Sequence, residues 1–148
     1  MSPLWRTVFR VVYRVLRIAE PLIRTWYRAF GLGNVVELRV RSRSSGRPRS
    51  VLLGVLRAGG SLYVGHPNGE AAWTRDLAAA GHAEVVWRTG PAVAIAPVRL
   101  PRGDERAAAI GATGQHPFPG NLIYRLARRH VVAVGVYFRL EPIGGSAD

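Results

Sequence analysis

A short arginine-rich segment carries the residues of this sequence that are best suited to binding an anion. It comprises Arg43, Ser44, Ser45, Gly46, Arg47, Pro48 and Arg49. A tight turn presents backbone N–H groups and hydroxyls, and arginine binds phosphate oxygens through two parallel N–H donors. The segment is therefore a candidate phosphate cradle, although an ordinary solvated hairpin turn in an arginine-rich protein would have the same composition.

A second candidate site is a glycine-containing loop that leads into an alanine-rich helix expected over 70–80. The loop comprises His66, Pro67, Asn68 and Gly69, and Trp73 follows it. Free N–H groups and the positive dipole at the start of a helix favour an anion there. The alternative is a simple Asn-Gly turn, with Trp73 packed in the core.

Isolated tyrosines and histidines are further candidates. Four tyrosines could donate hydrogen bonds to a substrate or could pack in the core or an interface, namely Tyr13, Tyr27, Tyr124 and Tyr137. His116 and His130 lack the spacing of metal ligands, so we interpret both as structural or surface residues and expect no metal site. The chain has no cysteine, which excludes disulfides and thiolate catalysis.

The first 30 residues predict an amphipathic helical arm. Pro21 divides the arm into two helices or kinks one, and Gly31 and Gly33 end it. Apolar residues occupy one side, and six arginines lie opposite within an arc of roughly 80°. These arginines are Arg6, Arg10, Arg14, Arg17, Arg24 and Arg28.

The net charge of +12 predicts attraction to polyanions. Because the arginines of the arm are backed by an apolar face, we expect an anionic membrane surface as the partner and no nucleic acid. Alternatively, the apolar face packs on the rest of the chain or on a second copy in a homodimer, and packing and membrane docking can both hold because the apolar arc is roughly 180° wide. The arm is too interrupted by arginine to span a membrane or to act as a secretory signal. We therefore expect a cytoplasmic protein, peripherally associated with the inner face of the plasma membrane.

After Asn34 the pattern changes to short apolar segments joined by tight turns, such as the Gly59-Gly60 hairpin. Strands are predicted over 35–40, 50–57, 61–65, 82–88, 92–100 and 131–140, and helices over 70–80, 104–110 and 121–129. About six mostly antiparallel strands favour an α+β fold with the sheet closed into a small barrel. The predicted organisation is a helical arm (1–33), a barrel (34–143) and a disordered tail (144–148).

The order of these segments resembles the deazaflavin-dependent nitroreductase family, whose members use the reduced coenzyme F420. The shared features are a strand, an Arg-x-Ser-Gly-x-x-Arg turn from Arg43 to Arg49, an apolar strand, a Gly-Gly hairpin, a glycine loop and a helix carrying Trp73. The resemblance covers about 34–87 and extends more loosely to the last strand. It implies an FMN-binding-type split β-barrel.

The resemblance also implies roles for individual residues. Arg43, Ser44, Ser45, Arg47 and Arg49 would hold the phosphate-bearing tail of the coenzyme, while His66, Pro67, Asn68, Gly69 and Trp73 would line the phosphate and the deazaflavin. The cofactor would be F420, with FMN a less favoured alternative. Ser42, Asn68 and the acidic Asp76 stand where the family pattern has other residues.

The activity implied by the resemblance is hydride transfer from reduced F420. The acceptor would be a quinone-like, nitro or unsaturated lipid-like molecule at the membrane surface. In such an enzyme the cofactor performs the chemistry, and no side chain is singled out as catalytic. The alternative is a non-catalytic, membrane-associated protein of the same fold that binds a fatty acid or another anionic ligand.

Overall fold

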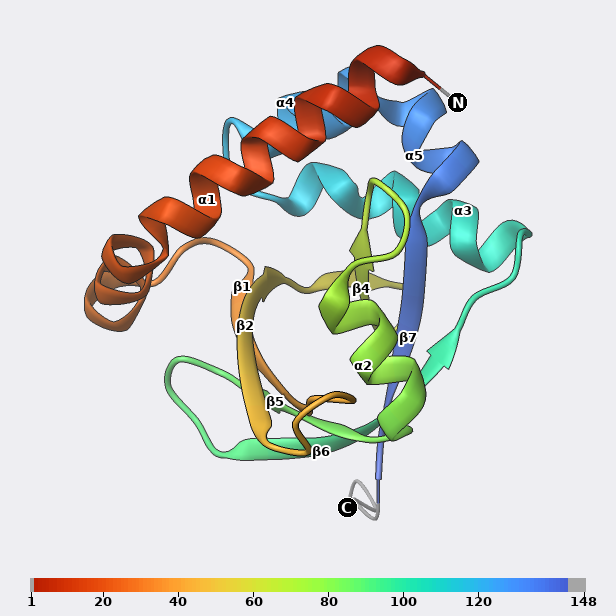
Figure 1. Ribbon diagram of the computed structural model, residues 1–148. Helices are drawn as coiled ribbons and strands as arrows, with labels where there is room; N and C mark the ends of the chain where they lie inside the picture. Colours follow the sequence, from red (N-terminus) through yellow and green to blue (C-terminus); the bar gives the residue numbers. More distant parts are fainter. Residues whose placement is uncertain (1, 144–148) are drawn as a thin grey trace.

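Seven strands form one antiparallel sheet that curls around a core, with helices packed about it (Figure 1). The computed structural model describes residues 2–143. The strand order is β2-β1-β5-β6-β7-β4-β3. The strands are β1 (Val35–Arg41), β2 (Pro48–Gly54), β3 (Leu56–Ala58), β4 (Ser61–His66), β5 (Ala83–Val86), β6 (Ala92–Arg99) and β7 (Val136–Pro142). The predicted α+β fold with an antiparallel split barrel is thus confirmed.

The two edges of this sheet belong to one continuous segment of chain. Only Val55 separates β2 from β3, and β2 pairs with β1 whereas β3 pairs with β4. The side-chain amide of Asn34 donates to the Val55 carbonyl at 3.0 Å, and the Val55 N–H donates to the Asn34 carbonyl at 3.0 Å. A single bent strand therefore closes the barrel, which agrees with the one strand predicted over 50–57.

Alternation along β1 shows how the core inside the barrel is built. Val36, Leu38 and Val40 are buried, and the residues between them point to the opposite face of the sheet. The helix α2 (Ala72–Ala80) adds the fully buried Leu77 to the same core. The core thus lies between the inner face of the sheet and α2.

The helices α3 (Asp104–Gly111), α4 (Gly120–Leu126) and α5 (Arg128–Val134), with the short 3₁₀ helix η1 (Ala112–Gln115), lie between β6 and β7 in sequence. The strand predicted over 131–140 is wrong in its first part, because 131–134 belong to α5. Val131 is fully buried in a second core cluster. Its burial there outweighs the preference of β-branched valines for strands.

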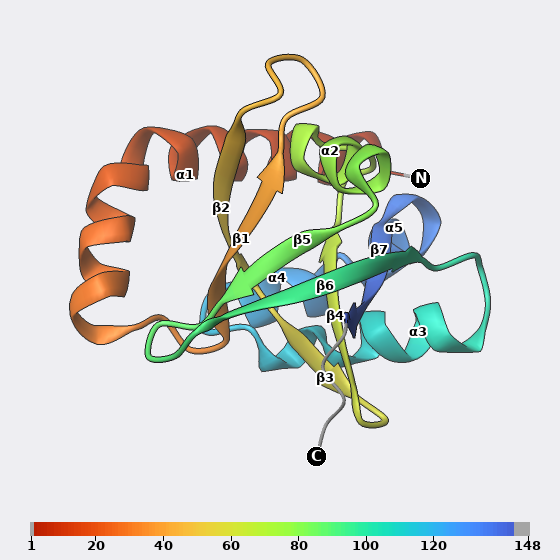
Figure 2. The same cartoon turned by 90° about the horizontal axis from the view of Figure 1, so that it is seen from below.

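The N-terminal arm is one helix, α1 (Pro3–Phe30), and it contains Pro21. Figure 2 shows that α1 bends sharply into two limbs. The first limb packs on the second core cluster through the buried Phe9. The second limb lies along the β1–β2 hairpin, where the Arg24 guanidinium donates to the Ser50 carbonyl at 2.8 Å. The inner side of the arm therefore packs on the barrel.

The predicted boundary between arm and barrel falls in the loop between α1 and β1, and it stays a prediction. The predicted tail, 144–148, lies outside the described residues. Within 2–143 no helix combines the length and the apolar character needed to cross a membrane.

A substitution at Gly65 tests the packing of β4 on β7. A Cβ at Gly65 would lie 2.2 Å from the ring of Tyr137, its partner across the sheet. We expect Gly65→Ala to lower the free energy of unfolding by about 1–3 kcal/mol through overpacking, as measured by urea denaturation. Gly114→Ala is the matched control, because a Cβ there meets no atom within 4 Å. Equal stability of both variants would contradict this packing.

Candidate functional site

The arginine turn between β1 and β2 is fixed by a buried carboxylate on α2. Asp76 is only 2% exposed. Its Oδ1 accepts from the Arg43 backbone N–H at 3.1 Å and from Arg43 Nε at 2.9 Å. Its Oδ2 accepts from Arg49 Nη1 at 3.4 Å. The carboxylate therefore orients two of the arginines that we predicted from the sequence as phosphate ligands. Because its charge is paired with these arginines, Asp76 does not act as an isolated negative charge beside the predicted phosphate site.

The ionisation of Asp76 follows from these contacts. Burial of the carboxylate would raise its pKa, but hydrogen bonds from Arg43 and the charges of Arg43 and Arg49 lower the pKa below the ordinary value. Asp76 is thus ionised at neutral pH. One negative charge then pairs with two guanidinium groups, and the exposed Arg47 adds a third positive charge to the same turn.

The serines of the turn form hydrogen bonds within it. Ser42 is buried, its hydroxyl accepts from the Ser45 N–H at 3.4 Å, and it lies 3.1 Å from the Ser44 hydroxyl. The Ser45 hydroxyl accepts from the Arg47 N–H at 3.2 Å. In the part of the chain that the structure describes, the Arg47 guanidinium forms no hydrogen bond or ion pair. Arg47 and the exposed halves of Arg43 and Arg49 are therefore the donors that an anion can reach.

The loop of His66, Pro67, Asn68 and Gly69 is held by α1. The Asn68 side-chain amide donates to the Arg6 carbonyl at 3.2 Å, and its oxygen lies 2.8 Å from Nε2 of the buried His130. The polar groups of Asn68 thus join α1 to α5. His130 serves as a structural link, in agreement with its interpretation from the sequence.

His66 is likewise engaged within the protein. Its Nδ1 lies 3.0 Å from the Gly69 carbonyl, and its ring contacts the ring of Tyr13 of α1 in a tilted arrangement with centroids 4.8 Å apart. Burial lowers the pKa of His66 below its ordinary value, so its ring is neutral at pH 7. The first limb of α1 therefore covers the predicted loop.

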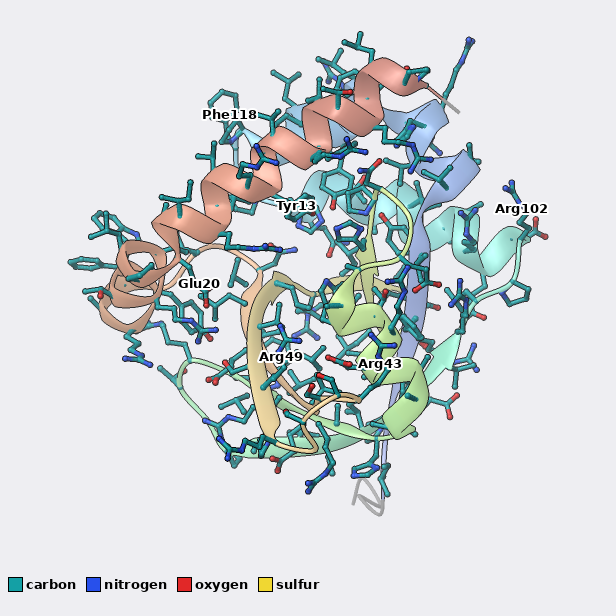
Figure 3. The ribbon with its side chains drawn as sticks, viewed as in Figure 1. Tyr13, Glu20, Arg43, Arg49, Arg102 and Phe118 are labelled. Atoms are coloured by element: carbon teal, nitrogen blue, oxygen red, sulfur yellow. The ribbon has the colours of Figure 1, made fainter. Side chains whose placement is uncertain are left out.

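The predicted residues form two groups beside α2, one before its start and one next to Asp76 in its middle. Arg43 and Arg49 lie between the β1–β2 hairpin and α2, and Tyr13 points from α1 toward the start of α2 (Figure 3). The loop 66–69 directly precedes α2 there. Trp73, at the start of the helix, packs against the barrel core. The helix α2 is the element that positions both groups.

A cluster of three tyrosines lies beneath α1, next to the loop 66–69. The hydroxyls of Tyr13 and Tyr124 lie close enough for each to influence the pKa of the other. The Tyr137 hydroxyl is buried close to them and has no hydrogen-bond partner among residues 2–143. Tyr27, the fourth tyrosine that the sequence offered, lies apart on the second limb of α1.

Burial keeps the groups of the tyrosine cluster uncharged. It raises the pKa of each of the three hydroxyls above the ordinary value. His116, whose ring stacks on Tyr124 with centroids 4.8 Å apart, has its pKa lowered by burial to about 4. The cluster thus offers neutral O–H donors, which suit an acceptor that gains negative charge. No sequence pattern indicates the place of His116 in this cluster, because His116 is remote from Tyr13 and Tyr137 along the chain.

Within 2–143, no group of three His, Asp or Glu side chains is placed to hold a metal ion.

Comparisons with known proteins bear on the fold. No protein-family model matches the chain, and no curated protein matches its sequence. The heme storage protein HutZ from Vibrio cholerae matches with a TM-score of 0.55 and 17% identity, over 85% of this chain and 91% of that chain.

Two further solved structures match at similar levels. A protein of unknown function from Agrobacterium tumefaciens gives a TM-score of 0.55 at 14% identity, over 76% of this chain and 50% of that one. A candidate 5-nitroimidazole antibiotic resistance protein from Bacteroides thetaiotaomicron gives 0.51 at 9% identity, over 75% and 74%. Identities this low establish the fold alone, which is the split β-barrel.

Removing the Asp76 charge tests the anchor of the turn. We expect Asp76→Asn to lower the free energy of unfolding at pH 7 by about 1–3 kcal/mol. Since the folded-state pKa of Asp76 is lowered, its contribution is present above the unfolded-state pKa and disappears as the pH falls through the folded-state value. The difference from the original protein should therefore shrink in acid. Glu84→Gln, at an exposed position, is the control, and an Asp76→Asn effect that does not change with pH would contradict this role.

Proposed function

We propose that this protein transfers a hydride from reduced coenzyme F420 to an apolar quinone-like, nitro or unsaturated lipid-like acceptor at a membrane surface. The observation that carries the proposal is the arginine turn anchored on Asp76. Two guanidiniums are oriented by one buried carboxylate, and Arg47 remains exposed beside them. The tail of the coenzyme carries a phosphate and carboxylates, and fixed arginines are well suited to bind such groups.

The residues of the turn fit the anionic tail of the coenzyme by charge and by donor chemistry. Arg43, Arg47 and Arg49 would bind the tail, and Asp76 would keep two of them in place. The bound coenzyme would supply the hydride. FMN would present one phosphate to the same arginines, whereas F420 adds carboxylates, so the positive excess at the turn favours F420.

The tyrosine cluster supports a reductive reaction near the loop 66–69. An acceptor that takes up a hydride gains negative charge, and a neutral O–H donor can stabilise that charge. The Tyr137 hydroxyl is free of other partners within 2–143. Tyr13 links the cluster to the loop through its tilted ring contact with His66.

The outer side of α1 supports membrane docking of the same protein. Large apolar side chains are exposed there and on the neighbouring segment around α4, namely Leu4 (69%), Ile18 (76%), Leu22 (77%), Phe30 (68%), Phe118 (77%) and Leu126 (63%). Large exposed apolar side chains gathered on one helix and its neighbouring segment are typical of an interaction site. We propose that this surface, which we call the outer apolar face, docks on the inner leaflet of the plasma membrane.

Arginines border the outer apolar face. Arg10, Arg14 and Arg17 are exposed along α1. At the start of α1, a hollow of about 550 Å³ is lined by Trp5, Leu126 and three arginines of α4 and α5. These last arginines are Arg125, Arg128 and Arg129. Apolar insertion surrounded by arginine suits a leaflet of anionic lipid.

One observation favours the alternative of a non-catalytic binder. The polar groups of Asn68 and His66 are used to hold α1 and the loop itself, so fewer of them are available to a cofactor. A protein of this kind would hold an anionic ligand at the arginine turn without turnover. Binding and turnover must therefore be measured separately.

Titration with the coenzyme tests the cofactor. We expect the fluorescence of F420 to change saturably as the protein is added, and we expect Arg47→Gln to weaken binding roughly tenfold through loss of a charged hydrogen bond. Arg75→Gln, exposed on α2, removes the same charge away from the turn and should bind as the original does. No fluorescence change with tens of micromolar protein would refute F420 binding. If the protein binds the reduced coenzyme but does not oxidise it when a soluble quinone is added, the result would favour the non-catalytic binding protein.

Co-sedimentation with lipid vesicles tests the outer apolar face. We expect binding to phosphatidylglycerol vesicles that exceeds binding to phosphatidylcholine vesicles, and we expect Leu22→Glu to weaken it roughly tenfold or more. Ile143→Glu places the same charge at another exposed apolar residue, beyond the end of β7, and should have little effect. If Leu22→Glu leaves vesicle binding unchanged but converts a dimer to a monomer, the face is a homodimer interface instead.

A further inference from the structure

We infer that a second anion site, which takes a phosphate group, lies between the second limb of α1 and the outer face of the barrel. A pocket of about 160 Å³ is found there. Its polar lining consists of Arg24, Tyr27 and Arg28 of α1, Glu37 of β1 and Arg88 after β5. This site does not depend on the function proposed above.

The sheet separates this pocket from the arginine turn. Successive residues of a strand point to opposite faces. On β2, Arg49 points toward Asp76 of α2, whereas Ser50 points toward Arg24 of α1. The pocket therefore lies on the outer face of the β1–β2 hairpin, and a phosphate bound at the turn would not occupy it.

Two of the three arginines are free to bind a ligand. Arg24 already donates to Glu20 at 2.6 Å and to the hydroxyl and carbonyl of Ser50. Arg28 and Arg88, by contrast, form no hydrogen bond or ion pair with any residue in the described range 2–143. Two guanidiniums without partners thus line one small pocket.

The one carboxylate of the pocket is already engaged. Glu37 Oε1 accepts from the Ser50 hydroxyl at 2.7 Å and from Arg39 Nε at 3.3 Å. Burial would raise the pKa of Glu37, but these hydrogen bonds and the charges of Arg39 and Arg24 lower it. Glu37 is therefore ionised, and Arg39 and Arg24 offset its charge. The positive charges of Arg28 and Arg88 remain uncompensated.

The Tyr27 hydroxyl is an independent sign of a missing partner. Tyr27 is 6% exposed, and its hydroxyl is buried with no hydrogen-bond partner among residues 2–143. Glu37 and Arg88, which both line the pocket, are the charged groups that influence this hydroxyl. A buried hydroxyl without a partner is costly. An oxyanion held by Arg28 and Arg88 would supply the acceptor that it lacks.

The backbone also favours the position of Arg88. Gly31, directly after α1, has a φ of 78°, which suits glycine, and a Cβ there would lie 3.0 Å from Arg88 Nε. Glycine at this position lets Arg88 lie against the end of α1. Arg28, Arg88 and Tyr27 thus line a space large enough for a tetrahedral phosphate group, and they carry more donors than a carboxylate needs.

Calorimetric titration of the coenzyme-free protein with inorganic phosphate tests the site. We expect saturable binding with a dissociation constant of about 1 mM or below, and weaker binding of acetate. Arg88→Gln should weaken phosphate binding roughly tenfold, and Tyr27→Phe should weaken it roughly fivefold, since each removes one donor to a charged ligand. Arg75→Gln should leave it unchanged.

Two results would overturn the site. One is the absence of saturable phosphate binding, and the other is equal weakening by Arg75→Gln and Arg88→Gln, which would show attraction to net charge alone. Arg47→Gln separates this site from the turn, because it should affect F420 and spare phosphate in this pocket. Phosphatidylglycerol vesicles distinguish the source of the phosphate. Unchanged vesicle binding by Arg88→Gln indicates a soluble ligand, whereas weakened binding indicates a lipid phosphate in the same pocket.

Discussion

The bend in α1 is the constraint on which the other features of this structure depend. A straight helix of 28 residues is about 42 Å long and could contact a small barrel along only part of its length. Pro21 lacks the N–H that would donate to the carbonyl of Arg17. The helix therefore bends there without losing a further hydrogen bond. One limb then places Phe9 and Tyr13 over α5 and the β4–α2 loop, while the other places Arg24 and Tyr27 against β1 and β2.

Charge is used in different ways on the two faces of the β1–β2 hairpin. On the inner face, the buried Asp76 orients Arg43 and Arg49, and on the outer face Glu37 and Ser50 engage Arg39 and Arg24. In both places a carboxylate fixes some arginines and leaves others without a partner. The net charge of +12 is therefore not spread evenly over the surface. Part of it is concentrated in arginines that lie beside ion pairs on the two faces of the β1–β2 hairpin.

Local sequence patterns predicted the local structure well, but they did not predict contacts between residues that are far apart along the chain. The strands and the Arg43 turn follow from alternation and turn residues, which act over a few positions. The bonds between Asp76 and Arg43 join residues 33 apart, and the tyrosine cluster gathers Tyr13, Tyr124 and Tyr137. No periodicity encodes such pairs. The strand prediction for 131–134 is wrong because burial in the second core cluster stabilises a helix there. Local propensity does not include this burial.

The amphipathic pattern of α1 predicted one apolar face, but the structure divides that face into two parts. Trp5, Phe9 and Tyr27 lie within roughly 40° of one another around a helix and turn toward the barrel. Leu4, Ile18 and Leu22 lie roughly 100° or more from Trp5 and are exposed. Packing on the barrel therefore leaves these outer residues available for the lipid docking that we propose. A helix that only packed on the barrel would need no leucine or isoleucine on its far side, and these exposed residues are therefore the part of α1 that packing on the barrel does not explain.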